Sequence, residues 1–185
     1  MEQATLGLGC YSCAEAMFKQ LNGVESVVVG YSGGSVTNPT DEQVSSKKSG
    51  HAEVVHIEFD PTIISYDELL EVFWKMHDPT TVNRQGSNVG PQYRSVIFYH
   101  NDKQRTLAEQ YKEKLNATHA FDRPIVTEIA EFKDFYPAAK KHQDFFGLNP
   151  KDEYCTLVIQ PKVEEFEKVF AKKLRPASTK PADQK

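Results

Sequence analysis

Short strand-like segments and helical segments alternate along this chain, and that alternation limits the folds that it can adopt. The strand-like segments are apolar, β-branched or aromatic, and they cover residues 4–9, 24–29, 53–59, 96–99 and 125–129. Helical patterns separate them without interruption. The series predicts an α/β or α+β fold, a single domain in which helices flank a central mixed β-sheet.

The clearest helical signal begins at Ser65, which forms a capping box with Glu68. The apolar residues that follow, within 69–76, share one helical face. Further helices are expected over residues 103–115, 138–146 and 163–174. Two long segments rich in glycine, asparagine, proline and serine, residues 31–50 and 77–92, interrupt the pattern. Irregular segments of such length inside a domain are usually functional, so we expect site residues there.

Length and charge narrow the function classes. Residues 1–174 form one expected catalytic domain, and the polar residues 175–185 form an expected disordered tail. The 22 basic and 26 acidic residues give a net charge of −4 without a basic stripe, which argues against nucleic-acid binding. No apolar run approaches the ~20 residues of a membrane span, and Met1-Glu2-Gln3 does not begin a signal peptide, so a cytoplasmic protein is expected. We also expect a monomer.

Cys10 lies where a predicted strand ends and a predicted helix begins. The first turn of a helix presents unpaired N–H groups and a partial positive charge, and both stabilise a thiolate. Cys10 is therefore a candidate nucleophile. The alternative is a buried cysteine that packs as a small hydrophobic residue.

Cys10 and Cys13 form a C-x-x-C motif, which has three interpretations: a dithiol redox site, half of a zinc site, or chance. Zinc needs further ligands at comparable spacing, and Cys155 has no nearby histidine. We therefore expect neither a metal nor another cofactor. A dithiol–disulfide oxidoreductase of the thioredoxin kind stays open, because that motif also joins a strand to a helix.

A longer string of short motifs decides between these interpretations. In order, it comprises Gly9-Cys10-Tyr11, Gly30-Tyr31-Ser32-Gly33-Gly34, Asn38-Pro39-Thr40, Gly50-His51-Ala52-Glu53, His77-Asp78-Pro79-Thr80, Arg84-Gln85-Gly86, Gln92-Tyr93-Arg94-Ser95, His142-Gln143 and Asn149-Pro150. From Gly9 to Cys155 the chain resembles the A-type peptide methionine sulfoxide reductases. The resemblance implies protein repair after oxidative stress: reduction of methionine S-sulfoxide, free or in oxidised proteins, with thioredoxin as the reductant.

The chemistry of that family gives roles to individual residues. A thiolate that attacks a sulfoxide sulfur pushes charge onto the oxygen, which must be protonated to leave. By resemblance Cys10 is the nucleophile, Glu53 is the general acid and Tyr93 hydrogen-bonds the oxygen. The resulting sulfenic acid condenses with a second thiol. The family match favours Cys155 on a flexible C-terminal segment, whereas proximity favours Cys13, and we slightly prefer Cys155.

Several positions near the chemistry depart from the family. Tyr11 keeps the first of two aromatic residues that pack around the substrate methyl group, but Ser12 stands where tryptophan is usual. Asp41 replaces a tyrosine that helps to hold the oxygen, and Asn88 replaces an aspartate. These are the expected substrate-binding positions. Losing the tryptophan predicts a more open pocket. Besides a reductase and a dithiol–disulfide oxidoreductase, the chain could therefore also be a non-catalytic module that binds methionine segments.

Overall fold

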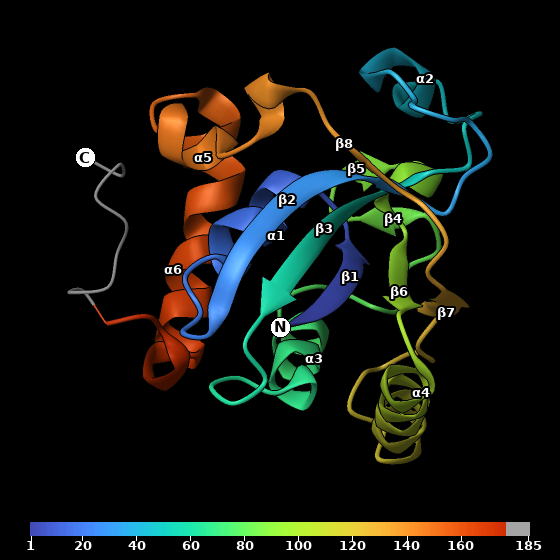
Figure 1. Ribbon diagram of the computed structural model, residues 1–185, viewed down its shortest axis with the longest axis vertical. Coiled ribbons are helices and arrows are strands. Elements are labelled where there is room, and N and C mark those ends of the chain that lie inside the picture. Colours follow the sequence, from blue (N-terminus) through green and yellow to red (C-terminus); the bar gives the residue numbers. More distant parts are fainter. Residues whose placement is uncertain (177–185) are drawn as a thin grey trace.

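Six strands form the central sheet of the computed structural model, which describes residues 1–176 (Figure 1). Their order across the sheet is β7-β6-β1-β3-β2-β8. Neighbouring strands are antiparallel except for β6 and β7, so the sheet is mixed and the predicted fold class is confirmed. The strands are β1 (Glu2–Leu8), β2 (Val24–Ser32), β3 (Ala52–Phe59), β6 (Ser95–Tyr99), β7 (Glu128–Glu131) and β8 (Phe135–Pro137).

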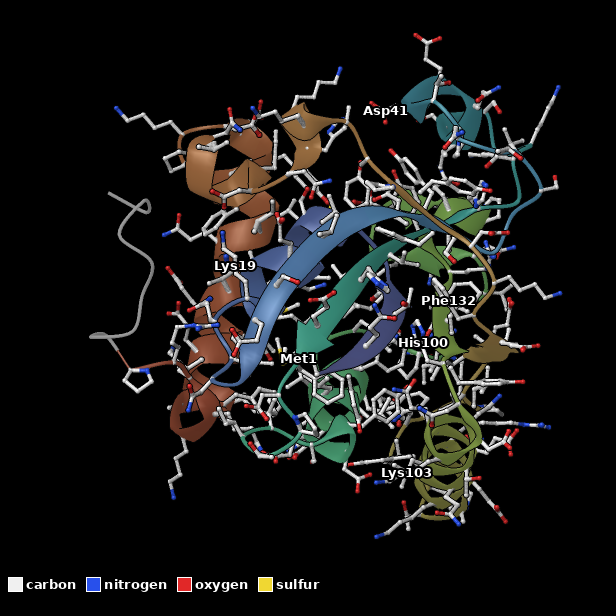
Figure 2. The ribbon with its side chains drawn as sticks, in the orientation of Figure 1. Met1, Lys19, Asp41, His100, Lys103 and Phe132 are labelled. Atoms are coloured by element: carbon white, nitrogen blue, oxygen red, sulfur yellow. The ribbon has the colours of Figure 1, made fainter. Side chains whose placement is uncertain are left out.

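Alternating side chains give the sheet two different faces. Leu6 of β1 packs into the main core, while its neighbour Thr5 hydrogen-bonds the ring nitrogens of His56 and His100 at 2.8 and 2.9 Å. On that second face the His100 ring stacks on Phe132 with ring centroids 4.2 Å apart, and both residues are labelled in Figure 2. The helices therefore cover mainly the first face.

Helices α1 (Tyr11–Phe18) and α3 (Tyr66–Lys75) pack against this first face, and α1 crosses behind the strands in Figure 1. Helix α4 (Asp102–Ala117) contacts β6 and β7, and α6 (Gln160–Val169) packs on α1. The capping box predicted for α3 is confirmed, because the Ser65 hydroxyl accepts from the Glu68 N–H at 3.1 Å. Among residues 1–176, no helix has both the length and the apolar character required to cross a membrane.

The two long segments contain short elements of their own. Helix α2 (Asp41–Ser45) lies in the first, and Thr40 caps it. The second holds a small hairpin of β4 (Arg84–Gln85) and β5 (Asn88–Val89), followed by the 3-10 turn η1 (Pro91–Tyr93). Residues of both segments line one cavity together with the start of α1.

The helix predicted over residues 138–146 is wrong. After β8 the chain forms the 3-10 turn η2 (Lys140–His142) and then the short helix α5 (Phe145–Leu148). The Gln143 side chain interrupts any longer helix, because it bonds the backbone N–H and C=O of Val29 at 3.0 and 2.9 Å. Asp144 then takes a left-handed conformation with φ of 53°.

Other element boundaries also differ from the predictions. The strand expected over residues 125–129 is β7 at 128–131, since the N–H groups of Ile125 and Val126 bond to Asn116 and Pro79 instead. The last helix starts earlier, with the π-helical turn η3 (Cys155–Ile159) leading into α6, and the turn η4 (Ala171–Lys173) follows.

The chain beyond α6 returns to the sheet. Arg175, the predicted first residue of the tail, is anchored: its N–H donates to the Gln20 carbonyl at 2.7 Å, and its guanidinium bonds the Val24 carbonyl. The predicted tail otherwise falls largely on residues 177–185, which lie outside the described residues.

Candidate active site

Gly9 sets the position of the nucleophilic thiol. It has φ of +93°, and a Cβ there would lie 2.7 Å from the Gln85 side chain, so only glycine fits this turn. The turn ends β1 and places Cys10 at the N-cap of α1, in an extended conformation with φ −62° and ψ 121°. The predicted strand-to-helix junction is thus present, with Cys10 at its head.

Hydrogen bonds converge on the Cys10 sulfur. The Cys13 thiol contributes most, the Tyr154 hydroxyl adds a second bond, and the backbone N–H groups of Cys13 and Ser12 add more. Burial opposes them, but together these donors lower the pKa of Cys10 to about 6. The same bond to Cys10, together with burial, raises the pKa of Cys13. At neutral pH Cys10 is therefore a thiolate and Cys13 a thiol that donates to it.

A cavity of about 320 Å³ opens over this thiolate. It brings together site residues that the sequence spreads over more than eighty positions. The predicted residues that line it are Cys10, Tyr11, Ser12, Asp41, Glu53, Asn88 and Tyr93. Cys13 lies beneath it, on the first turn of α1.

Glu53 faces the thiolate from the start of β3. Its Oε1 accepts the backbone N–H of Tyr11 at 3.2 Å, which fixes the carboxyl at the head of α1. Burial and the nearby charge of Cys10 raise the pKa of Glu53 to about 8, against the opposing effect of the Tyr11 hydrogen bond. Thiolate and carboxylic acid therefore coexist between about pH 6 and pH 8.

Tyr93 is the last residue of η1 and is half-buried at the pocket. Burial raises its pKa to about 12, and the negative charges of Glu53 and Cys10 add to the effect. The phenol therefore keeps its proton at neutral pH and can donate a hydrogen bond to an oxygen above Cys10.

Asp41 is the first residue of α2 (Figure 2), and it lines the pocket. Its carboxylate accepts from the Tyr31 hydroxyl and from Nε2 of His142, both at 2.6 Å. Burial works against ionisation, but these two hydrogen bonds outweigh it and lower the pKa of Asp41. Tyr31 in turn bonds the Tyr11 hydroxyl at 3.1 Å, so the residue that replaces the family tyrosine anchors a polar network.

Cys155 differs from its expected setting. We predicted it on a flexible segment, but it is fully buried and begins the helical turn η3. Burial and the negative charges of Asp152 and Cys10 raise its pKa, so its thiol is not activated. The described residues thus offer one thiol in contact with Cys10, that of Cys13, and a second one packed in the core nearby.

Four aromatic residues of the pocket were not among the predicted site residues: Tyr31, His142, Phe145 and Tyr154. The sequence carries a weak signal for Tyr154, which directly precedes Cys155. It carries none for Phe145, which falls near the end of the helix predicted over residues 138–146 but is the first residue of α5 in the structure.

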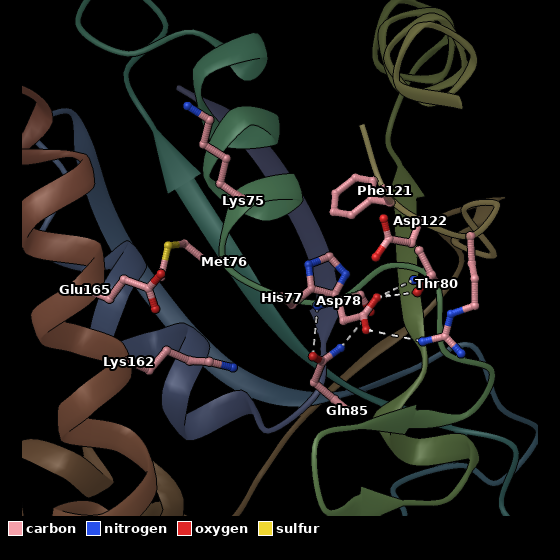
Figure 3. A pocket seen from close by; sticks show the side chains of 11 residues that line it. Lys75, Met76, His77, Asp78, Thr80, Gln85, Phe121, Asp122, Lys162 and Glu165 are labelled. Carbon is pink, nitrogen blue, oxygen red and sulfur yellow. Dashed lines mark hydrogen bonds and ion pairs between the residues drawn. The ribbon is translucent and has the colours of Figure 1, made fainter. Parts of the chain in front are cut away.

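A second cavity, of about 410 Å³, is lined in part by Gln85 (Figure 3). Its walls mix both charges: Lys75, Lys162 and Arg123 face it along with Asp78, Asp122 and Glu165. His77 is buried beside it with a pKa lowered to about 3 by burial, and its ring bonds the Ser95 hydroxyl at 2.7 Å. This cavity includes none of the cysteines, so it is not the site of thiol chemistry.

A thiolate beside a second thiol and a protonated carboxyl, at the head of a helix in a mixed sheet, defines a thiol-dependent oxidoreductase. Comparison with known proteins refines this class. The model of the family "Peptide methionine sulfoxide reductase" matches residues 2–174. The chain belongs to this family and is a peptide methionine sulfoxide reductase, which sets aside the non-catalytic interpretation.

Individual relatives agree. Peptide methionine sulfoxide reductase MsrA of Sulfolobus acidocaldarius is 51% identical over 94% of this chain and 97% of its own length, and that of Natronomonas pharaonis is 50% identical over 92% and 96%. Reduced Mxr1 from Saccharomyces cerevisiae superposes with a TM-score of 0.77 at 32% identity, covering 83% of this chain and 88% of its own. Mxr1 in complex with Trx2 gives a TM-score of 0.55 at 27% identity, covering 78% and 84%.

Proposed function

We propose that this reductase acts on the S epimer of methionine sulfoxide, free or in oxidised proteins, and that thioredoxin regenerates it. One observation carries the reaction: the pocket holds a Cys10 thiolate and a protonated Glu53 at the same pH. Sulfoxide reduction by a thiol needs both at once, a nucleophile for the sulfur and a proton for the oxygen.

In the proposed first step, the Cys10 sulfur attacks the sulfur of the sulfoxide. Glu53 transfers its proton to the sulfoxide oxygen, and Tyr93 donates a hydrogen bond to the same oxygen. The S–O bond to the substrate breaks as the oxygen passes to Cys10. The products are methionine, reduced by two electrons, and a Cys10 sulfenic acid, oxidised by two electrons.

In the second step, a thiol attacks the sulfenic sulfur, water leaves and a disulfide forms. We propose that Cys13 supplies this thiol, because it already contacts Cys10 and no segment has to move. The preference for Cys155 rested on the family match and on a flexible segment, whereas Cys155 is fully buried in η3. Its proposed role is a later relay, in which it exchanges with the Cys10–Cys13 disulfide.

Thioredoxin is the proposed reductant for two reasons. A C-x-x-C disulfide at a helix terminus is a good substrate for thiol–disulfide exchange. The related Mxr1 has also been crystallised in complex with Trx2. A monomeric state and a cytoplasmic location stay predictions.

A second function, general disulfide reduction, is favoured by the contact between Cys10 and Cys13. One assay separates the two. The purified chain is mixed with thioredoxin, thioredoxin reductase and NADPH, and is given the separated S or R sulfoxide of methionine or of a methionine peptide. We expect NADPH consumption with the S epimer alone. Insulin is tested without thioredoxin, which reduces it directly: faster reduction of insulin disulfides by dithiothreitol when the chain is present, without turnover of either sulfoxide, would establish the second function instead.

A further inference from the structure

Two residues of the pocket differ from those that the family resemblance leads one to expect. Ser12 stands where a tryptophan would form an apolar wall. Asp41, which is already bonded to Tyr31 and His142, stands where a tyrosine hydroxyl would hold the substrate oxygen. The pocket is not empty at this side, however. Ser12 is only 5% exposed, and aromatic rings from a distant part of the chain line the same cavity.

The Tyr154 hydroxyl has polar partners on two sides. Nδ2 of Asn88 donates to its oxygen at 3.2 Å, and on the other side the hydroxyl bonds the sulfurs of Cys10 and Cys13. A phenol has a single proton. Asn88 occupies an acceptor site of the oxygen, and Cys10 is the thiolate of the two sulfurs, so that proton is directed to Cys10.

The identity of residue 88 matters for this orientation. An amide donates through its nitrogen, as Asn88 does, whereas a carboxylate can only accept. An aspartate at position 88 would compete with Cys10 for the proton of Tyr154. The substitution of aspartate by Asn88 and the presence of Tyr154 beside the thiolate are therefore chemically matched.

Phe145, the first residue of α5, contributes a second ring from the same part of the chain. The neighbouring Asp144 holds it in place: its side chain bonds Lys19 and its N–H donates to Glu15 at 3.1 Å, both on or next to α1. Tyr154 and Phe145 thus line the same cavity as Cys10 and Glu53.

We propose that Tyr154 is a catalytic residue of this reductase. Its hydroxyl, oriented by Asn88, holds the Cys10 thiolate, and its ring forms with Phe145 the apolar wall for the substrate methyl group that Ser12 does not provide. The inference deepens the proposed function and depends on it for the substrate. The role towards Cys10 does not need the substrate at all.

The test compares Tyr154→Phe, Tyr154→Ala and Asn88→Asp with the wild type, and uses Tyr111→Phe as the control. Tyr111 is a half-buried tyrosine on α4 that packs on Trp74, and it does not line the pocket. Two quantities are measured: the pH dependence of Cys10 alkylation by iodoacetamide, located by fragmentation mass spectrometry, and kcat and KM for methionine S-sulfoxide. Circular dichroism verifies that each variant is folded.

Loss of the hydroxyl in Tyr154→Phe should raise the pKa of Cys10 and leave about tenfold less thiolate at pH 6, the size of effect expected for one charge-assisted hydrogen bond. Asn88→Asp should shift the profile in the same direction. Tyr154→Ala should in addition raise KM about tenfold, because the wall is lost. Tyr111→Phe should match the wild type in both quantities.

An alkylation profile of Tyr154→Phe that superposes on the wild type overturns the role of the hydroxyl. An unchanged KM in Tyr154→Ala overturns the role of the ring. A wild type that shows the low Cys10 pKa but reduces neither sulfoxide epimer would instead refute the proposed function, while the alkylation data would still decide the contact between Tyr154 and Cys10.

Discussion

The two sides of the pocket are held in different ways. On one side, Cys10 and Glu53 stand at the junction of α1 with β1 and β3, where backbone geometry fixes them: a glycine turn, a helix start and a backbone N–H. On the other side, the segment that carries Phe145 and Tyr154 is attached through side chains, by Gln143 to β2, by Asp144 to Lys19 and by Asn88 to Tyr154.

Positions that are fixed by backbone geometry tolerate few substitutions, whereas a side-chain hydrogen bond can be lost or replaced without a change of fold. Cys10 and Glu53 are therefore rigidly placed. The apolar wall of Phe145 and Tyr154 is held by side-chain contacts, which can differ between relatives. This explains how Ser12 can stand where a family tryptophan is usual without leaving the pocket unlined. The predictions below test each side in turn.

The largest effect is expected on the rigid side, at Glu53. Glu53→Gln keeps the shape but removes the transferable proton, so turnover should fall by ~10²-fold or more. In the wild type, activity should rise as Cys10 ionises at about pH 6 and fall as Glu53 loses its proton at about pH 8. The alkaline limb should vanish in the variant. Glu58→Gln, an exposed position on the same strand, is the control. An equal loss of turnover in Glu58→Gln would argue against Glu53 as the proton donor.

Gln143 tests the attachment of the other side. Gln143→Ala removes hydrogen bonds to both backbone groups of Val29 and to the Ala138 carbonyl. The Val29 carbonyl keeps the Ala138 N–H at 2.9 Å, but the Val29 N–H loses its Gln143 partner, and this loss should cost about 1–3 kcal/mol of unfolding free energy. KM should also rise, because Gln143 anchors the segment that carries the substrate-contacting rings, and kcat should change less than kcat/KM. Urea unfolding measures the first effect, and the exposed Gln160→Ala should change it by less than about 0.5 kcal/mol.

A smaller effect is expected when an aromatic residue is placed on α1, at position 12, to replace the ring of Tyr154. In a Tyr154→Ala background, Ser12→Trp should lower KM by about twofold to tenfold, the range of a sulfur–aromatic contact. In the wild type, where Tyr154 and Phe145 already line the pocket, the same substitution should bring no gain. Steady-state kinetics decide the matter. A lower KM for Ser12→Trp in the wild type would mean that the wall is vacant.

The smallest effect is expected for Asp41→Asn. The charge of Asp41 contributes to the raised pKa of Glu53, so removing it should lower that pKa and move the alkaline limb to lower pH. Turnover at pH 8 should fall by at most about fivefold, since interactions of half-exposed charges are on the order of 1 kcal/mol. A limb that moves to higher pH would contradict the assignment of that limb to Glu53.

The difference between the two sides also explains what the sequence could predict. Cys10 at a helix start follows from local signals, namely a strand, a glycine and a helical pattern. Glu53 and Tyr93 could be assigned only by resemblance, because their pKa values depend on burial among distant segments. The helix expected over residues 138–146 failed because Gln143 bonds Val29, a contact between residues more than a hundred positions apart that no local pattern encodes.

The central claim, that Cys10 takes the oxygen and Cys13 closes the first disulfide, can be measured in a single turnover. One equivalent of methionine S-sulfoxide is added without reductant to the wild type, Cys13→Ser and Cys155→Ser, and disulfides and sulfenic acid are mapped by mass spectrometry. We predict one equivalent of methionine in each case, a Cys10–Cys13 disulfide in the wild type and in Cys155→Ser, and a slower decay of the Cys10 sulfenic acid in Cys13→Ser. A Cys10–Cys155 disulfide that forms equally fast with and without Cys13, or no methionine at all, would contradict the account.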